Sequence, residues 1–341
     1  MVTEIADSGA AGTYFPSDYI AGDPSAVVTD DSCALGDIPI IDFSFLSNGI
    51  PETRAEIVRE LGQACEEWGF FTVVNHGVTE EMRAAMMDAF VGFFDLAAEE
   101  KDEYLGRRVM DPIRMGTSFN STVEDAPYWR HFLKIWVHPL FHSPTKPTVF
   151  REVSEDYAKH TRYLAKELLK GILDSLGLGE KEMEEALDLD SCSQVLVGNI
   201  YPPCPNPELT WGIPSHSDPG LLTVLMQNET DGLQVMHHGK WVCVNALPNS
   251  FLVNLGDHME IVSNGRYKSV LHRAKVDNQN TRISIVTAIG PSLDTVVVPA
   301  PSLLQRGNHP AAFRGIKYGD FVEHQQSSRL KEKSVLDHLR V

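Results

Sequence analysis

The sequence predicts an α+β, mainly β protein, built as a sandwich or jelly roll of short antiparallel strands with helices packed outside it. Three observations carry this prediction. From residue 194 onward, β-rich runs follow one another at intervals of roughly 8 to 12 residues. Strong helical periodicity ends before that point, near residue 176. The 341 residues, 43% of them hydrophobic, are sufficient for a sizeable core.

Three regions follow one another along the chain. Residues 1–36 are rich in Gly, Ala, Ser and Asp without a sustained apolar period, which predicts a flexible lead-in. Residues 37–150 alternate helical and β-rich patterns and are expected to form an N-terminal mixed α and β region. Residues 151–341 are expected to hold a long helix, the β core and a C-terminal segment.

The N-terminal region is predicted to begin with a strand over residues 38–43. Thr53 and Glu56 have the spacing of a capping box, which predicts a helix opening there and ending at Gly69. The β-branched and aromatic run at residues 70–74 predicts a strand, with a second helix after it.

The C-terminal region begins with apolar residues at helical spacing, which predict a helix over 155–176 with Gly177 as its stop. The β-rich runs come next, and His238-Gly239 is a plausible hairpin turn between two of them. The predicted strands cover residues 194–201, 221–226, 233–237, 241–245, 251–255, 269–276, 283–289 and 295–298.

Charge and composition exclude several classes of partner. The formal net charge of −18, spread along the chain without a basic stripe, argues against nucleic acid and anionic membranes. No apolar run reaches the roughly 18 residues of a membrane span, and the N-terminus lacks the pattern of a signal peptide. The five cysteines are scattered without a C-x-x-C pair. We therefore expect free thiols and a cytoplasmic location.

One group of residues has the chemistry of a metal site. His216 and Asp218 lie two positions apart, and in an extended segment such residues point to the same side. His272, in a later β-rich run, would supply a third ligand. Two histidines and one carboxylate leave open positions on an octahedral metal, which suits iron(II) oxygenases. The alternative is a capped turn at Asp218 and a hydrogen-bonded core histidine at His272.

A second pair of residues lies nearby in sequence. Arg282 and Ser284 open a predicted strand on one face, and arginine offers a rigid fork that matches a carboxylate. Their partner would be either an anionic ligand or a structural Asp or Glu. The residues alone leave this choice open.

Taken together, the motifs resemble the plant-type 2-oxoglutarate- and iron(II)-dependent dioxygenases, which include hydroxylases of hormone and specialised metabolism. The segments at 38–42 and 67–78 look like the family's N-terminal region. Asn199-Ile200-Tyr201-Pro202-Pro203-Cys204-Pro205 is similar to its N-Y-Y-P-x-C-P motif, with Ile200 in place of the middle aromatic residue. The ligand group and the Arg-x-Ser pair stand in the family's order and spacing.

This resemblance implies a double-stranded β-helix, a jelly-roll core of cupin type, supported by N-terminal and packing helices. It implies an oxidoreductase in which His216, Asp218 and His272 bind catalytic iron(II). Arg282, Ser284 and Tyr201 would bind 2-oxoglutarate, with Asn199 pointing toward the co-substrate and the metal. Substrate C–H hydroxylation or desaturation would accompany conversion of 2-oxoglutarate and O2 to succinate and CO2, with ascorbate as reductant. The family is usually monomeric.

The substrate is expected to be a small, largely apolar metabolite of phenolic, terpenoid or alkaloid class. Arg114, Asn120, Trp129 and Arg130, in the middle of the chain, are candidates for polar contacts with it. The small side chains that follow Ser284 on one strand face predict room above the metal, although close sheet packing explains them equally well. The predicted pocket residues are Phe119, Phe132, Val197, Leu222, Ala288 and Gly290.

Three other functions compete with this one. A zinc hydrolase would use the same ligand types, but it needs a general-base glutamate near the metal and has no use for Arg282 and Ser284. A non-catalytic binding protein on the same fold is disfavoured because all three ligand residues are present. Oxygenases of this fold that use another reductant remain open.

Overall fold

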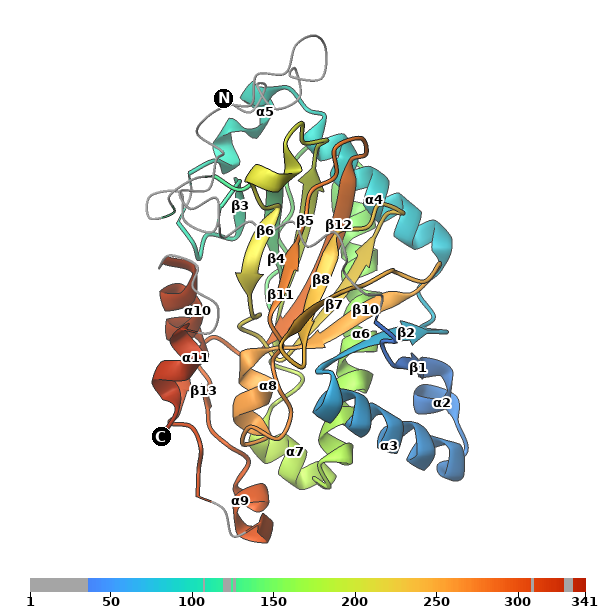
Figure 1. Ribbon diagram of the computed structural model, residues 1–341, viewed down its shortest axis with the longest axis vertical. Helices are drawn as coiled ribbons and strands as arrows, with labels where there is room; N and C mark the ends of the chain where they lie inside the picture. Colours follow the sequence, from blue (N-terminus) through green and yellow to red (C-terminus); the bar gives the residue numbers. More distant parts are fainter. Residues whose placement is uncertain (1–35, 107, 119–123, 125–126, 308–309, 328–333) are drawn as a thin grey trace.

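The computed structural model describes residues 36–106, 108–118, 124, 127–307, 310–327 and 334–341. Within these ranges, none of the helices is both long enough and apolar enough to span a bilayer. The strand layers lie at the centre of the molecule, with helices on both sides (Figure 1).

Two β-sheets form the core. The larger has eight strands in the order β1-β2-β10-β7-β12-β5-β4-β3, and the smaller has four in the order β6-β11-β8-β9. All neighbouring pairs in these two sheets are antiparallel except β1 with β2. The strands of the larger sheet are β1 (Ile40–Asp42), β2 (Phe70–Val74), β3 (Ile113–Gly116), β4 (His131–His138), β5 (Ser193–Tyr201), β7 (Leu222–Gln227), β10 (Phe251–Leu255) and β12 (Arg282–Gly290). Those of the smaller sheet are β6 (Ile213–His216), β8 (Leu233–His237), β9 (Lys240–Cys243) and β11 (His272–Ala274), and a separate pair joins β13 (Val296–Val297) to β14 (Ile316–Lys317).

The larger sheet is backed by a helical layer. Helix α6 contacts β7 and β12 and also packs against α3 and α4, so these helices cover the sheet on the side away from the smaller sheet (Figure 1). At the C-terminal end, α10 and α11 lie together. The helices are α2 (Phe43–Asn48), α3 (Pro51–Glu67), α4 (Glu80–Phe94), α5 (Ala98–Lys101), α6 (Phe150–Ser175), α7 (Glu180–Ala186), α8 (Asp257–Val262), α9 (Pro301–Gly307), α10 (Tyr318–Ser327) and α11 (Ser334–Leu339), with 3-10 turns η3 (Asp102–Tyr104) and η4 (Pro207–Leu209).

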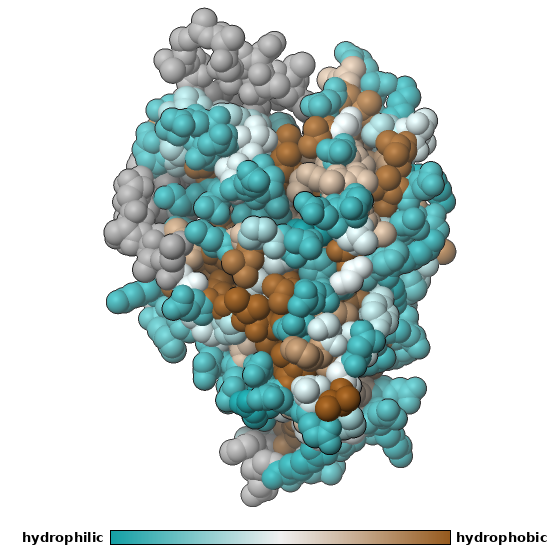
Figure 2. Space-filling model, turned by 90° about the vertical axis from the view of Figure 1, so that its right-hand side faces the viewer, coloured by the Kyte–Doolittle hydropathy of each residue, from teal (hydrophilic) through white to brown (hydrophobic). Residues whose placement is uncertain are grey.

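Alternation along the strands separates a packed face from an open one. In β12, Ile285 and Ile289 are fully buried in the main hydrophobic cluster with the helices, whereas Arg282, Ser284 and Val286 point the other way and line a cavity. The strand face toward the helices therefore carries apolar residues, and the face toward the cavity carries both apolar and polar ones. The face shown in Figure 2 is largely hydrophilic, with apolar side chains gathered in limited patches.

Several predicted elements are confirmed. The strands predicted at 70–74, 233–237 and 251–255 have the observed bounds. His238 and Gly239 connect β8 to β9 with φ values of 48° and 76°, the left-handed conformation that a tight hairpin turn requires. The long helix begins at Phe150, earlier than predicted, and ends before Gly177, whose φ is 76°.

Other predictions are wrong in detail. Helix α3 begins at Pro51 with Ile50 as its N-cap, and the Thr53 hydroxyl donates to the Ile50 carbonyl instead of capping the helix. Proline at the first helical position already fixes the start. Free thiols are observed at Cys65, Cys192 and Cys204, but Cys243 forms a disulfide. The predicted lead-in lies almost wholly outside the described residues.

Candidate metal centre and co-substrate pocket

The two histidines of the predicted ligand group meet across a pair of strands. His216 is the last residue of β6 and His272 is the first of β11, and the antiparallel register places them directly opposite each other. Their ring centroids are 4.3 Å apart. Residues far apart in sequence are therefore brought together by strand pairing, as the β-rich patterns suggested.

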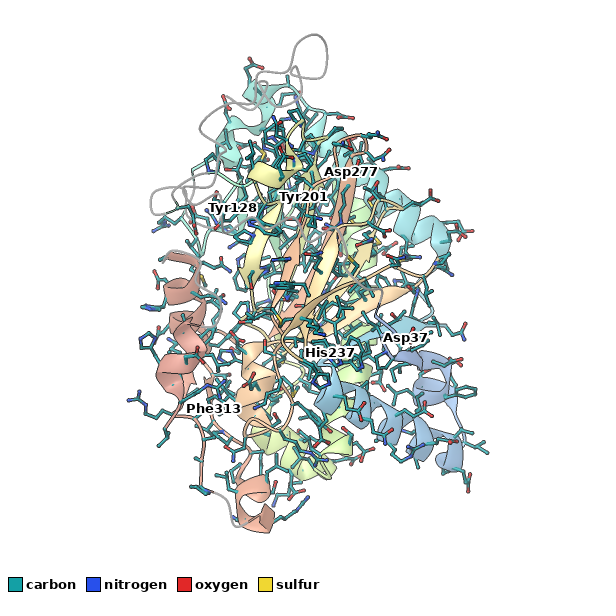
Figure 3. The ribbon with its side chains drawn as sticks, in the orientation of Figure 1. Asp37, Tyr128, Tyr201, His237, Asp277 and Phe313 are labelled. Atoms are coloured by element: carbon teal, nitrogen blue, oxygen red, sulfur yellow. The ribbon has the colours of Figure 1, made fainter. Side chains whose placement is uncertain are left out.

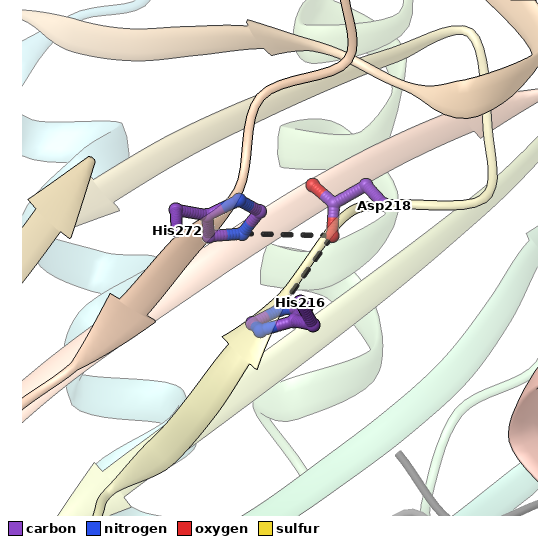
Figure 4. Close-up of side chains that lie close together, drawn as sticks. All are labelled: His216, Asp218 and His272. Carbon is purple, nitrogen blue, oxygen red and sulfur yellow. Dashed lines mark ion pairs between the residues drawn. The ribbon is translucent and has the colours of Figure 1, made fainter. Parts of the chain in front are cut away.

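Asp218 completes the group from the loop that follows β6. Its Oδ1 lies 3.9 Å from Nε2 of His216 and 3.7 Å from Nε2 of His272 (Figure 4). The three ligand atoms all lie within 4.8 Å of one another, a separation that one metal ion can bridge. The residues predicted as ligands thus converge on a single point.

Hydrogen bonds orient each of the three side chains. Nδ1 of His216 lies 2.9 Å from the Pro214 carbonyl, and Nδ1 of His272 lies 3.2 Å from the Val270 carbonyl. A carbonyl can only accept, so each Nδ1 carries the proton and each Nε2 presents a lone pair to the centre. This is the tautomer that a metal-binding histidine needs.

The second oxygen of Asp218 is held by two donors. Oδ2 accepts hydrogen bonds from the Thr223 hydroxyl at 2.6 Å and from the Asn254 amide at 2.8 Å. Thr223 and Asn254 face each other on neighbouring strands β7 and β10. Oδ1 is therefore the oxygen left to face the histidines.

The electrostatics favour ligands in their metal-binding forms. Burial, together with the neighbouring His272, lowers the pKa of His216 to about 3, so its imidazole is neutral near pH 7. Burial opposes ionisation of Asp218, but the adjacent histidines and the hydrogen bonds from Asn254 and Thr223 outweigh it and lower its pKa. A neutral imidazole beside a carboxylate is ready to bind a divalent ion.

A cavity extends from this centre between the two sheets. Of the predicted pocket residues, Phe132, Val197 and Ala288 line it. Leu222 does not, because alternation in β7 turns Thr223 and Leu225 toward the cavity and Leu222 into the core. Gly290 does not either: a Cβ there would lie 2.1 Å from the Tyr318 hydroxyl, so Tyr318 already fills that space. Phe119 lies outside the described residues.

Arg282 lies at one end of the cavity and is almost fully buried, with 1% of its surface exposed. Its Nη2 donates to Oε1 of Gln227 at 2.8 Å, its guanidinium stacks over the Tyr201 ring at 5.1 Å, and its Nε has no hydrogen-bond partner. Burial lowers its pKa, a shift that Tyr201 and Asp231 oppose. Within the described ranges no carboxylate forms an ion pair with it. Asp231 therefore acts on Arg282 without forming an ion pair, and none of the described Asp or Glu side chains is a direct partner of the guanidinium.

Asn199, Tyr201 and Ser284 lie near Arg282 on the paired strands β5 and β12. In the register of β5 with β12, Tyr201 lies opposite Arg282 and Asn199 opposite Ser284, with the Asn199 amide 3.4 Å from the Ser284 hydroxyl. Tyr201 lies among the strands near the upper end of the sheets in Figure 3. Arg130 adds a second guanidinium, whose Nη1 donates to the side-chain Oδ1 of Asn199 at 2.9 Å.

The remaining sequence candidates divide. Arg114 and Arg130 line the cavity. Trp129 does not, since it is fully buried and its indole N–H donates to the Pro202 carbonyl at 3.0 Å. Asn120 lies outside the described residues. No glutamate is found among the described residues that line the cavity, so the general base expected of a zinc hydrolase is lacking there.

Sequence reasoning missed Thr223, Gln227 and Asn254. All three lie on the cavity side of strands that the sequence did predict, and stepping by two from Thr223 along β7 reaches Gln227. The signal was therefore present as a polar residue recurring at the period of a strand. This polar period was obscured because apolar residues dominate both β7 and β10.

Comparisons with known protein families agree with the geometry. Residues 192–291 match the 2OG-Fe(II) oxygenase superfamily, in which 2OG is 2-oxoglutarate. Residues 38–154 match the family described as non-haem dioxygenase in morphine synthesis N-terminal. The first match contains the His-Asp-His group and the Arg-x-Ser pair.

Individual relatives are similar over nearly the whole chain. The chain is 51% identical over 305 residues to 2-oxoglutarate-dependent dioxygenase 19 of Oryza sativa subsp. japonica, covering 89% of this chain and 90% of the rice protein. It is 34% identical over 338 residues to flavanone 3-dioxygenase 2 of the same plant, covering 98% and 96%. The crystal structure of JOX2 in complex with 2OG, Fe and JA superimposes with a TM-score of 0.85 at 28% identity, covering 100% of this chain and 97% of that one.

Proposed function

Because the chain belongs to the 2OG-Fe(II) oxygenase superfamily, whose members are oxidoreductases that use iron(II) and 2-oxoglutarate, we propose that it hydroxylates or desaturates a C–H bond of a small, largely apolar plant metabolite. 2-Oxoglutarate and O2 are converted to succinate and CO2 in the same reaction. One relative is named for flavanone and the solved JOX2 structure contains JA, so similarity alone does not select the substrate.

His216, Asp218 and His272 would hold the iron. Their three converging ligand atoms fit one divalent ion. The bound iron supplies the oxidising chemistry. The Pro214 and Val270 carbonyls orient the two imidazoles so that each Nε2 faces the ion site, and the Thr223 hydroxyl leaves Oδ1 of Asp218 directed toward it.

The buried guanidinium of Arg282 is the observation that carries this function. A nearly inaccessible cation whose hydrogen-bond acceptor is the neutral Gln227 needs an anionic ligand. Its buried Nε has no hydrogen-bond acceptor in the protein, and such a ligand would provide one. A dicarboxylate that reaches from the metal centre to Arg282 and Ser284 would supply that anionic partner. The Tyr201 ring packs against the guanidinium.

The substrate would lie beside this dicarboxylate. Val195, Val197, Val286 and Ala288 form an apolar wall on adjacent strands β5 and β12, where Val197 pairs with Val286 and Val195 with Ala288. Such a wall excludes water from the reacting centre and binds an apolar carbon skeleton. The two ends of the cavity then serve the co-substrate and the substrate separately.

An anaerobic titration tests the proposal. Adding iron(II) and then 2-oxoglutarate to the metal-free protein should give the weak visible charge-transfer band of the chelate. Arg282→Met should raise the apparent Kd for 2-oxoglutarate by roughly 30-fold or more, the low end of what the loss of a buried charge partner costs. Arg266→Met, at an exposed position that pairs with Glu66, is the matched control. Unchanged affinity in Arg282→Met would contradict the assignment.

A further inference from the structure

A second group of cations lies in the same cavity, away from Arg282. Arg114 on β3 stands directly opposite Lys134 on β4 in the antiparallel register, and both line the cavity. Each has only 7% of its surface exposed. Like charges directly opposite each other destabilise a strand pair, and burial increases the cost. An anion bound between them would offset it.

The contacts of Lys134 leave it able to bind a ligand. Its ammonium group donates to the Val109 carbonyl and to Oε1 of Gln326 in α10, 3.2 Å away. Both acceptors are neutral, and an ammonium group has three N–H donors, so one is left for the cavity. The carboxylate of Asp111 favours the charged lysine but hydrogen-bonds to Arg108. Among the described residues, none forms an ion pair with Lys134.

In the ligand-free protein, the ammonium group of Lys134 therefore holds its proton weakly. Burial, and next the charge of Arg114, lower the pKa of Lys134 to about 7, although Asp111 acts in the opposite direction. Most surface lysines keep a full charge at that pH. A ligand carboxylate beside the ammonium group would restore it.

The register separates this pair from the co-substrate end. Lys134 lies opposite Val197, which pairs with Val286, whereas Tyr201 pairs with Arg282. Arg282 and Val286 are four residues apart on β12, about 13 Å along an extended strand. The Arg282 and Lys134 positions are thus two different anion sites, with the apolar wall beside the second.

We propose that Arg114 and Lys134 bind a carboxylate of the substrate, so that this oxygenase acts on an acidic small molecule whose apolar part lies along Val197 and Val286. The inference rests on the proposed function and names the substrate class for that site. The remaining N–H of Lys134 would donate to one carboxylate oxygen, and the guanidinium of Arg114, which itself donates to the Ser118 carbonyl, adds a second positive charge beside it. The charges of the cavity lining also favour an anionic ligand. Asp218 is the one carboxylate among the described lining residues, whereas the cations are Arg114, Arg130, Lys134, Arg273 and Arg282.

Matched pairs of acids and esters test this inference. Binding of benzoate, cinnamate and indole-3-acetate to the iron(II)- and 2-oxoglutarate-loaded protein is compared, by anaerobic calorimetry, with binding of their methyl esters. At least one acid should bind roughly 30-fold or more tightly than its ester. Lys134→Met should remove that preference, and Lys134→Arg, which keeps the charge, should retain most of it.

Controls separate this outcome from the proposed function. Lys101→Met removes another buried lysine, one that donates to the Phe94 carbonyl and does not line the cavity, and it should leave the acid preference intact. Should Lys134→Met fail to fold, Arg114→Gln carries the same prediction. If no acid binds more tightly than its ester, or if Lys134→Met keeps the preference, the inference is overturned. The 2-oxoglutarate titration described above is independent of either result.

Discussion

Thr223 donates its hydroxyl to Oδ2 of Asp218 at 2.6 Å and thereby determines which carboxylate oxygen faces the two histidines. The Asn254 amide holds the same oxygen from the next strand. Both donors belong to the larger sheet, whereas His216 and His272 belong to the smaller one. The ligand geometry therefore depends on residues that would not touch the metal.

Replacing Thr223 by Val should weaken iron(II) binding by roughly 10- to 100-fold, because the carboxylate loses one of its two orienting donors. Thr287→Val is the matched control, since Thr287 is a buried threonine on the face of β12 that points away from the cavity. The measurement is competition for iron(II) against a chelator of known affinity. Equal affinities in the two variants would refute the orienting role.

Gly256 is expected to be intolerant of any side chain. A Cβ at this position would lie 2.1 Å from the Gly220 carbonyl oxygen, in the loop that follows Asp218. The same contact region includes the bond from the Asp257 amide to the Asp218 carbonyl at 2.8 Å. Gly256→Ala should lower the free energy of unfolding by about 1–3 kcal/mol and weaken iron binding together. Gly92→Ala in helix α4, where a Cβ would lie 3.5 Å from the nearest atom, Cγ of Pro147, should be neutral or stabilising in urea unfolding.

Ala288 is expected to control access to the substrate wall. It lies between Val195 and Thr223 in the register of the larger sheet, so a phenyl ring at this position would project into the cavity. Ala288→Phe should abolish substrate-dependent succinate formation while the 2-oxoglutarate band still forms. Ile289→Phe, on the helix side of the same strand, should act through stability instead. Unchanged turnover in Ala288→Phe would show that the substrate does not use this wall.

Acid should destabilise the protein partly through His258. This residue is fully buried in α8, and burial lowers its pKa to about 4 although its bond to the Pro219 carbonyl opposes the shift. The unfolded chain, with a pKa near 6.5, binds a proton that the folded state refuses, so stability falls as pH drops from about 6.5 toward 4. Between pH 7 and 5 this costs about 2 kcal/mol. His258→Gln should reduce that loss in urea unfolding, whereas His160→Gln, at an exposed position of α6, should not.

Lys134 should cost the free protein stability. Its pKa, lowered from 10.5 to about 7 in the folded state, means that the unfolded chain binds more protons between those pH values, so this contribution to stability rises with pH there. Lys134→Met should therefore stabilise the ligand-free protein at pH 7 by on the order of 1–3 kcal/mol, with the gain shrinking toward pH 10. Thermal unfolding across this range measures it. A gain that does not depend on pH would point to packing instead of charge.

The strands that carry the candidate co-substrate residues could largely be predicted from sequence. β5, β7, β8, β10 and β12 lie within one or two residues of their predicted bounds because apolar residues dominate them. Their polar members recur at the two-residue period and already identified Arg282 and Ser284 as neighbours on one face. The pairing of His216 with His272 required knowledge of which strands are adjacent, which local patterns do not contain.

Strands β3, β4 and β6 were not predicted. In β4 the cavity face carries Lys134 between Phe132 and Trp136, and a buried charge breaks the pattern that marks a strand. The same buried lysine is the basis of the proposed carboxylate site. β6 was missed because Pro214 interrupts a four-residue strand at the edge of its sheet.

The loop from β6 to β7 runs from one sheet to the other and carries Asp218 as its second residue. An ion held by His216, His272 and Asp218 would thus link the smaller sheet to the larger one, in addition to its part in the chemistry. Removing the ion with a chelator should then weaken the contact between the two sheets at this end. Amide hydrogen exchange at β6 and β11 should accelerate on iron removal, while exchange within the α6-backed part of the larger sheet stays slow.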